Sequence, residues 1–250
     1  MDKVLFPHIK DIKKTAKLLW DKGWAEKNAG NFSINVTQEI INNTQNINDE
    51  LHNIAPPCSY LANNYLLITS SGSRMRDISE TPENYLFLIQ INNHGTGYYQ
   101  KSLSENVNDL QPSSELPTHL LLHNKLKKDN NSNKVILHAH ITEFIALTHI
   151  PKYQTEKTIN DLIWGMHPET KMFIPEGIGL VKYQTPGTQD IAMATLKKLN
   201  KNNIIIWEKH GCIALNNNLE QALDILDIAT KSITIFFMCK SSGYKPEGLT

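Results

Sequence analysis

Apolar patterns with a strand period and apolar patterns with a helix period alternate along the whole chain, and this mixture most constrains the fold. The strand-like runs lie at 28–36, 65–69, 86–91, 98–101, 135–140, 174–181 and 204–208. The helix-like patterns lie at 9–20, from 115 on, at 188–199 and from 218 on. Polar segments at 42–51 and 127–133 are expected to be surface loops. Because no repeat or linker separates these patterns, we expect one α/β domain over residues 1–250, with helices covering a central sheet.

Charge and hydropathy exclude several classes of protein. The 25 basic and 25 acidic residues cancel, so the chain has no large positive field with which to hold nucleic acid or an anionic bilayer. No apolar run approaches the roughly 20 residues of a membrane span. Charged residues also interrupt the N-terminus where a signal peptide would need an apolar core. We therefore expect a cytoplasmic protein that acts on a small molecule or binds a protein partner, without nucleic acid or membrane.

The cysteines limit how the chain could bind a metal. Cys58, Cys212 and Cys239 are odd in number and widely spaced, and they form no CxxC pair. This pattern favours reduced thiols over a disulfide framework or a thiolate zinc site. Any metal would therefore be held by histidine and carboxylate side chains.

A His-x-His pair ends one of the strand-like runs. Side chains two apart on a strand project to the same side, so His138 and His140 can close on one metal ion. His210 follows the run at 204–208 and would reach the same edge of the sheet from a second strand. Three neutral imidazoles with an open coordination position describe a catalytic zinc site. The alternative is that they are ordinary polar residues at strand ends.

Other titratable residues allow more than one interpretation. Glu115 stands at an expected helix start, where it could be a capping-region acid or a carboxylate that ligates a metal or moves protons. His119 and His123 lie four apart on the same helix, a spacing that suits a metal but is also common on helix surfaces. The residues alone do not decide between these alternatives.

Two small-residue loops could form an anion-binding cradle. The segment 28–31 reads Asn-Ala-Gly-Asn and the segment 69–73 reads Thr-Ser-Ser-Gly-Ser. Glycine lets backbone N–H groups approach a ligand, and the amides and hydroxyls add hydrogen-bond donors. Neither loop matches a Walker or dinucleotide motif, and each could also be an ordinary tight turn.

Taken in order, these segments resemble the successive motifs of the class II, zinc-dependent sugar-phosphate aldolases, a resemblance that covers nearly the whole chain from residue 20 to 243. The motifs are W-A-E-K-N-A-G-N at 24–31, T-S-S-G-S at 69–73, S-S-E-L-P-T-H at 113–119, H-A-H at 138–140, P-G-T at 186–188 and K-H-G at 209–211. Further cues at 23–24, 114–119, 145–148 and 175–179 are most similar to the branch of the family that acts on L-rhamnulose 1-phosphate.

The resemblance implies a fold, a reaction and a set of roles. The fold would be a three-layer α/β/α sandwich with a central, largely antiparallel sheet, in a homotetramer with one zinc ion per subunit. The reaction would be retro-aldol cleavage of L-rhamnulose 1-phosphate to dihydroxyacetone phosphate and L-lactaldehyde, in rhamnose catabolism. His138, His140 and His210 would bind the zinc, and Glu115 would be the catalytic acid/base. Glu169 would serve the aldehyde end of the site across a subunit boundary. The substrate phosphate would be held by Asn28, Gly30, Asn31, Ser71, Gly72 and Ser114.

Two features depart from the family pattern. Residues 164–168 read Trp-Gly-Met-His-Pro where the family has a different sequence, and the chain ends at Thr250 whereas relatives continue further. Other hypotheses are a fuculose-1-phosphate aldolase or a sugar-phosphate epimerase, a non-catalytic binding domain like the adducin head, and a zinc hydrolase or hydratase. Retention of the three histidines with Glu115 argues against the binding domain, and the two phosphate-like loops argue against the hydrolase.

Overall fold

A single sheet runs through the middle of the part of the chain that the structure describes. The computed structural model describes residues 5–40, 47, 50–103, 110–199 and 202–249. Its strands are β1 (Asn31–Asn35), β2 (His52–Asn53), β3 (Tyr65–Thr69), β4 (Leu86–Ile91), β5 (Gly97–Ser102), β6 (Val135–Ala139), β7 (Ile178–Val181), β8 (Ile204–Trp207) and β9 (Gly211–Asn216). They form one nine-stranded sheet in the order β2-β5-β4-β3-β1-β6-β9-β8-β7. Every neighbouring pair is antiparallel except β7 and β8, which run parallel.

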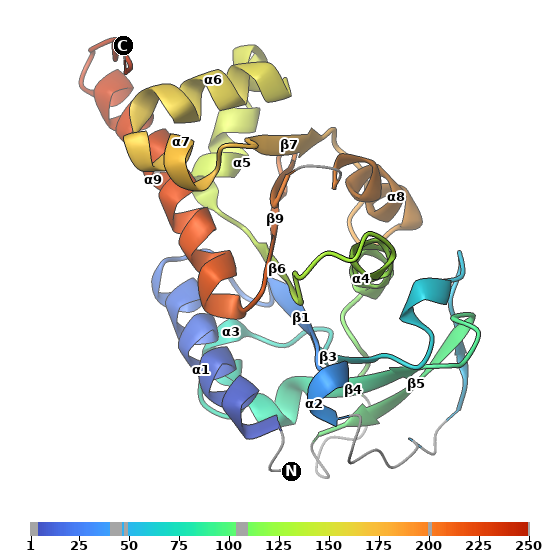
Figure 1. Ribbon diagram of the computed structural model, residues 1–250. Coiled ribbons are helices and arrows are strands. Elements are labelled where there is room, and N and C mark those ends of the chain that lie inside the picture. The colour runs from blue at the N-terminus through green and yellow to red at the C-terminus, as the bar shows by residue number, and fades with distance from the viewer. Residues whose placement is uncertain (1–4, 41–46, 48–49, 104–109, 200–201, 250) are drawn as a thin grey trace.

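Helices cover both faces of this sheet. They are α1 (Phe6–Asp21), α2 (Thr37–Ile40), α3 (Met75–Ile78), α4 (Leu116–Lys128), α5 (Thr142–Thr148), α6 (Glu156–Met166), α7 (Pro168–Phe173), α8 (Gln189–Lys198) and α9 (Leu219–Ser241). Figure 1 shows α1 and α9 on one side of the strands and α4 and α8 on the other. The expected three-layer α/β/α sandwich with a largely antiparallel sheet is therefore confirmed.

Strand β6 shows how the sequence produces these layers. Its side chains alternate between the two faces, as strand geometry requires. Leu137 belongs to the large apolar core that includes residues of α1 and α9. Ile136 belongs to the opposite core, with Leu122 of α4 and Ile191 of α8. Because both faces are covered, all five residues of β6 are buried, which explains why the run is continuously apolar up to His138.

Some segments differ from the sequence-based expectation. The expected strand at 174–181 begins only at Ile178, because Gly177 adopts a positive φ of 76° and donates a hydrogen bond back to the carbonyl of Ile174. Helix α4 continues to Lys128, so the expected loop at 127–133 is shorter. Helices α2, α3, α5, α6 and α7 and strands β2 and β9 were not anticipated. The expected loop at 42–51 lies mostly outside the described residues.

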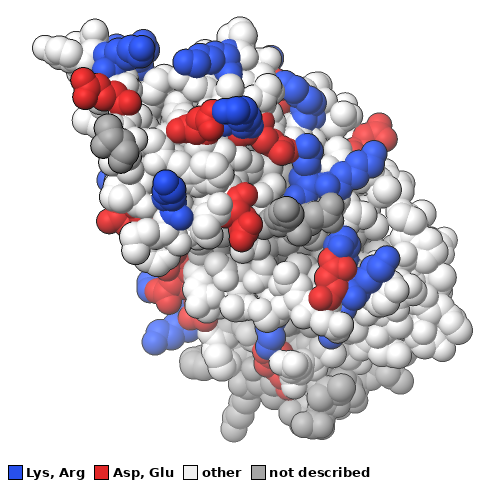
Figure 2. Space-filling model, turned by 45° about the horizontal axis from the view of Figure 1, so that its top comes forward, with Lys and Arg blue, Asp and Glu red and all other residues white. Residues whose placement is uncertain are grey.

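Charges of both signs are mixed on the surface (Figure 2), and the cysteines form no disulfide among the described residues. On the face shown in Figure 2, lysine and arginine side chains are interspersed with acidic ones, as the balanced charge of the sequence implies. Cys58, Cys212 and Cys239 are free thiols. Within the described part of the chain, no helix has both the length and the hydropathy needed to cross a bilayer.

Shortening Leu137 tests the packing of β6. Leu137 is fully buried in the large core, so we expect Leu137→Ala to lower the free energy of unfolding by about 2–5 kcal/mol through lost burial and an added cavity. Leu249→Ala is a matched control, because Leu249 is 53% exposed, and should change it by less than about 0.5 kcal/mol. Urea unfolding measures both values. Equal effects for the two variants would contradict this account of the core.

Candidate metal centre

Three histidines meet at one end of the sheet. His138 is the fourth residue of β6, His140 follows that strand directly, and His210 lies in the turn between β8 and β9. Because β6 pairs with β9, the end of β6 and this turn lie side by side. One ligand atom from each ring lies within 4.8 Å of the others, the only such group among the described residues. The structure thus brings together the three histidines that the sequence placed at one edge.

Hydrogen bonds orient two of the three rings. Nδ1 of His138 lies 2.9 Å from the backbone oxygen of Cys212, and Nδ1 of His140 lies 2.9 Å from Oε1 of Glu26. Both partners are acceptors, so each Nδ1 carries the proton and each Nε2 keeps a free lone pair. Metal-binding histidines are typically oriented in this way. Glu26 lies in one of the sequence motifs, but its role could not be predicted, because its contact with His140 joins residues 114 apart.

Burial keeps two of these imidazoles, His138 and His210, neutral. Burial lowers the pKa of His138 to about 3, with His140 adding to the effect. Burial also lowers the pKa of His210 to about 4. A neutral imidazole is the form that binds a metal. At neutral pH these two rings therefore need to lose no proton before they ligate.

Glu115 lies against the same cluster. Its Oε2 is 3.8 Å from Nε2 of His138, and its Oε1 is 4.0 Å from Nε2 of His210. The residue is only 5% exposed. Burial raises the pKa of the carboxyl, while a hydrogen bond from Asn31 and the nearby His210 and His140 act in the opposite direction. Nitrogen donors beside a carboxylate fit a transition metal such as zinc.

A cleft of about 330 Å³ opens onto the histidines. Its walls combine the cluster with three loops, and its lining residues are Glu26, Lys27, Asn28, Ala29, Gly30, Asn31, Ser70, Ser71, Gly72, Ser113, Ser114, Glu115, His138, His140 and His210. The six residues expected to hold a phosphate are all among them. At Gly30, which has a positive φ of 79°, a Cβ atom would lie 3.2 Å from the backbone oxygen of His138. Glycine is therefore what allows this loop to approach the cluster so closely.

Comparison with known proteins agrees with this arrangement. Residues 10–236 match the family described as Class II Aldolase and Adducin N-terminal domain. The chain belongs to this family. Its sequence is 34% identical to the rhamnulose-1-phosphate aldolase of Bacteroides thetaiotaomicron over 96% of this chain and 90% of that enzyme. It is 32% identical to the enzyme of the same name from Mannheimia succiniciproducens, over 91% of this chain and 84% of that one.

Solved structures show the same class II aldolase fold. A sugar-phosphate aldolase from Thermotoga maritima has a TM-score of 0.77 and 29% identity, covering 98% of this chain and 99% of that one. An L-fuculose 1-phosphate aldolase has a TM-score of 0.63 at 18% identity, covering 97% of this chain and 90% of that one. The resemblance drawn from the motifs is therefore confirmed at the level of the family and the fold.

Asn31 faces Glu115 in this class II aldolase chain. Its Nδ2 donates to Oε2 of Glu115 at 3.0 Å, and its Oδ1 lies 2.6 Å from Nε2 of His119. The side-chain amide is therefore engaged at both ends. Any contact of the Asn31 side chain with a phosphate would use the second hydrogen of Nδ2.

His119 and His123 are neither surface residues nor part of the histidine cluster. Both are almost completely buried. Nδ1 of His119 and Nε2 of His123 both contact Oγ of Ser33, at 2.7 and 2.8 Å. The sequence allowed either a metal-ligand role or an exposed position on the helix. The structure instead shows two buried histidines that both contact Ser33. The one sequence signal for this arrangement is Ser33, a polar residue that is itself buried in the middle of β1.

Glu169 lies outside the cleft within one chain. It is in α7, where its Oε2 lies 3.0 Å from Nε2 of His167. The family resemblance places this glutamate in the site of a neighbouring subunit. That role stays a prediction.

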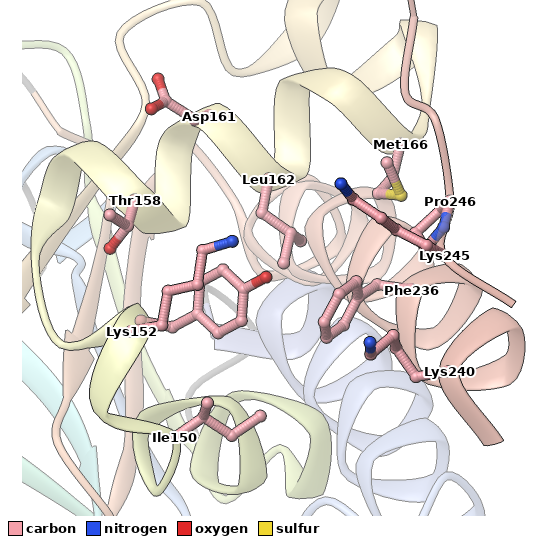
Figure 3. Close-up of a pocket in the computed structure, with 11 residues that line it drawn as sticks. Ile150, Lys152, Thr158, Asp161, Leu162, Met166, Phe236, Lys240, Lys245 and Pro246 are labelled. Atoms are coloured by element: carbon pink, nitrogen blue, oxygen red, sulfur yellow. The ribbon is translucent and has the colours of Figure 1, made fainter. Parts of the chain in front are cut away.

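A larger cavity of about 510 Å³ lies elsewhere in this family member (Figure 3). It is lined by Ile150, Lys152, Tyr153, Thr158, Asp161, Leu162, Met166, Phe236, Lys240, Lys245 and Pro246. These are mainly apolar side chains and lysines, without histidine or cysteine. Because the three clustered histidines and the glycine-containing loops meet only in the smaller cleft among the described residues, we place the candidate site there.

The buried histidines make stability depend on pH. Burial lowers the pKa of His123 from 6.5 to about 3, so between these values the folded protein binds fewer protons than the unfolded chain. The free energy of unfolding therefore falls as the pH falls through this window, by roughly 1 kcal/mol per pH unit for each such histidine. We expect His123→Asn to reduce this dependence, measured by urea unfolding from about pH 6.5 to about pH 4.

The control is His94→Asn, because His94 is exposed. This variant should keep the dependence of the parent protein. The same dependence in His123→Asn as in the parent would contradict the assignment of a neutral, buried His123.

Proposed function

We propose that the chain is a zinc-dependent aldehyde-lyase that cleaves L-rhamnulose 1-phosphate to dihydroxyacetone phosphate and L-lactaldehyde. The observation that carries the proposal is that one cleft joins a cluster of three histidines, a buried carboxylate and glycine-containing loops. The relatives named rhamnulose-1-phosphate aldolase at 34% and 32% identity support the choice of substrate. The sugar-phosphate aldolase structure from Thermotoga maritima supports the class of substrate.

His138, His140 and His210 would hold the zinc ion, one per chain. When bound, zinc supplies a Lewis acid that stabilises the negative charge of an enediolate without a Schiff-base lysine. Two of the rings present Nε2 because their Nδ1 atoms are bonded to Cys212 and Glu26. The orientation of these two rings is therefore set by a backbone carbonyl and by the Glu26 carboxylate, without any bound ligand.

Glu115 would act as the acid/base. Cleavage breaks the bond between the two halves of the substrate, and the electron pair of that bond stays on the dihydroxyacetone phosphate half. A proton must then be added to this carbon, and in the reverse reaction it must be removed. Glu115 lies at the cluster, and burial raises the pKa of its carboxyl, which brings it closer to the value that suits proton transfer near neutral pH. The hydroxyl that becomes the aldehyde oxygen must lose its proton, and Glu169 of a neighbouring copy, or a water molecule, would accept it.

The phosphate would bind at the loops that face the cluster. Asn28 and Gly30 come from the loop before β1, Asn31 is the first residue of β1, and Ser71, Gly72 and Ser114 come from two further loops. Gly30 and Gly72 both have a positive φ, so backbone N–H groups there can turn toward an anion. Binding at the phosphate, remote from the reacting bond, can orient the reacting carbon.

The proposal also covers assembly and location. We treat residues 1–250 as one class II aldolase domain that assembles as a homotetramer and works in the cytoplasm in rhamnose catabolism. The tetramer rests on the family resemblance. The cytoplasmic location rests on three free thiols and on a phosphorylated small-molecule substrate.

An L-fuculose 1-phosphate aldolase of the same fold gives the second candidate substrate. A coupled assay with L-rhamnulose 1-phosphate and L-fuculose 1-phosphate, with and without a chelator, separates the two. We expect dihydroxyacetone phosphate from the rhamnulose compound, loss of activity on chelation, and recovery when zinc is added back. Because each chain offers one histidine cluster among its described residues, the active protein should contain about one zinc per chain. Zinc-loaded protein that releases no dihydroxyacetone phosphate from either compound would refute the proposal.

Replacing Glu115 tests its role in proton transfer. Glu115→Gln keeps the size of the side chain but removes the base, so we expect kcat to fall about 10²–10⁴-fold while the zinc content stays unchanged. Glu156→Gln is the control, since Glu156 pairs with Lys198 away from the cleft. A Glu115→Gln variant with the kcat of the control would contradict this assignment.

A further inference from the structure

A continuous chain of hydrogen bonds leads from the cleft into the core. Asn31 Nδ2 lies 3.0 Å from Glu115 Oε2, and Asn31 Oδ1 lies 2.6 Å from His119 Nε2. His119 Nδ1 lies 2.7 Å from Ser33 Oγ, which lies 2.8 Å from His123 Nε2. All five residues are buried. The series therefore joins the proposed acid/base to two imidazoles that water does not reach.

The chemistry of the groups fixes the direction of every bond when Glu115 is ionised. A carboxylate only accepts, so Asn31 must turn Nδ2 toward it and Oδ1 toward His119. Oδ1 only accepts, so His119 carries its proton on Nε2. Nδ1 of neutral His119 then accepts from the Ser33 hydroxyl, whose oxygen accepts from Nε2 of His123. Each donor in the series points toward Glu115.

Local geometry places these groups in line. Asn31 and Ser33 are two apart on β1 and therefore project to the same face of the sheet. His119 and His123 are four apart on α4 and therefore lie on one side of that helix. Burial lowers the pKa of both histidines, so both are neutral, as the direction of the series requires. Strand and helix spacing thus assemble the network from residues up to 90 apart in sequence.

We propose that Ser33, His119 and His123 are positioning residues that lock the Asn31 amide, so that it holds Oε2 of Glu115 and leaves Oε1 for proton transfer. The proposal rests on the acid/base role proposed above for Glu115. A lone asparagine amide could rotate and present its oxygen to the carboxylate, which would repel it. The fixed tautomer of His119 prevents this, because Nε2–H needs an acceptor. The Ser33 hydroxyl accepts from Nε2 of His123 and donates to Nδ1 of His119, and thereby favours the same tautomer.

Ser33→Ala breaks the series at its middle. Without the hydroxyl, Nδ1 of His119 loses its hydrogen-bond partner, so the ring that holds the Asn31 amide is anchored at one nitrogen instead of two. We expect kcat for hydrogen exchange between water and dihydroxyacetone phosphate to fall about 10- to 100-fold, since misplaced catalytic groups cost this much. The KM for dihydroxyacetone phosphate should change less than about twofold, because the phosphate loops are untouched.

Ser232→Ala is the matched control. Ser232 is also completely buried and also has two hydrogen-bond partners, Thr170 and the backbone oxygen of Ile163, but it lies in α9 away from the cleft. It should lose stability like Ser33→Ala and keep the parent kcat. Ser33→Thr retains the hydroxyl and should recover most of the exchange rate. Equal kcat in Ser33→Ala and Ser232→Ala would overturn the proposal.

A spectroscopic measurement tests the network without any activity. In the zinc-free protein, ¹⁵N NMR of the imidazoles should show His119 protonated at Nε2 in the parent and in Ser232→Ala, and a shifted Nδ1 resonance in Ser33→Ala, because that nitrogen has lost its hydrogen-bond donor. A parent protein with His119 protonated at Nδ1 would overturn the proposal. If the parent protein shows the expected tautomer but exchanges no hydrogen with dihydroxyacetone phosphate, the proposed function fails while the network stands as a structural one, and the positioning role is refuted with it.

Discussion

The antiparallel pairing of β6 with β9 is the contact on which the candidate metal site depends. In its register Ala139 lies opposite Cys212, and this places the end of β6 beside the turn that carries His210. The same pairing brings the carbonyl of Cys212 to Nδ1 of His138, so one strand contact both positions a ring and fixes its tautomer. Gly211 makes this approach possible, because a Cβ atom there would lie 2.5 Å from the backbone oxygen of Ala139.

Exclusion of water gives the site its electrostatic character. Burial lowers the pKa of His138 and raises that of Glu115, because in both cases a dry environment disfavours the charged form. The two shifts serve different purposes. A neutral imidazole is ready to bind a metal, whereas a carboxyl with a raised pKa is a better proton acceptor at neutral pH. A single physical cause thus prepares both parts of the proposed chemistry.

The sequence predicted most of what has a short-range signal. The strand period placed His138 and His140 on one side, and the run before His210 indicated a second strand at the same edge. Helices α5 to α7 were missed, although Thr155 caps α6 by accepting from the backbone N–H of Thr158. The partners of Glu115 were out of reach, since its hydrogen bond joins residues 84 apart. Sequence spacing predicts faces of single elements, but contacts between elements depend on how the sheet is ordered.

Strand β1 connects the histidine cluster with the buried hydrogen-bond network that runs from Glu115 to His123. Asn31 lies opposite His138 in the pairing of β1 with β6, and Ser33 lies opposite Ile136. Buried polar groups are costly unless every donor and acceptor is satisfied, and apolar side chains would fill the space between β1 and α4 at lower cost. A hydrogen-bonded series that ends on one carboxylate is therefore better explained by the orientation of Glu115 than by stability. On this view the same strand sets both the distance of Glu115 from the histidines and the direction in which its carboxylate faces.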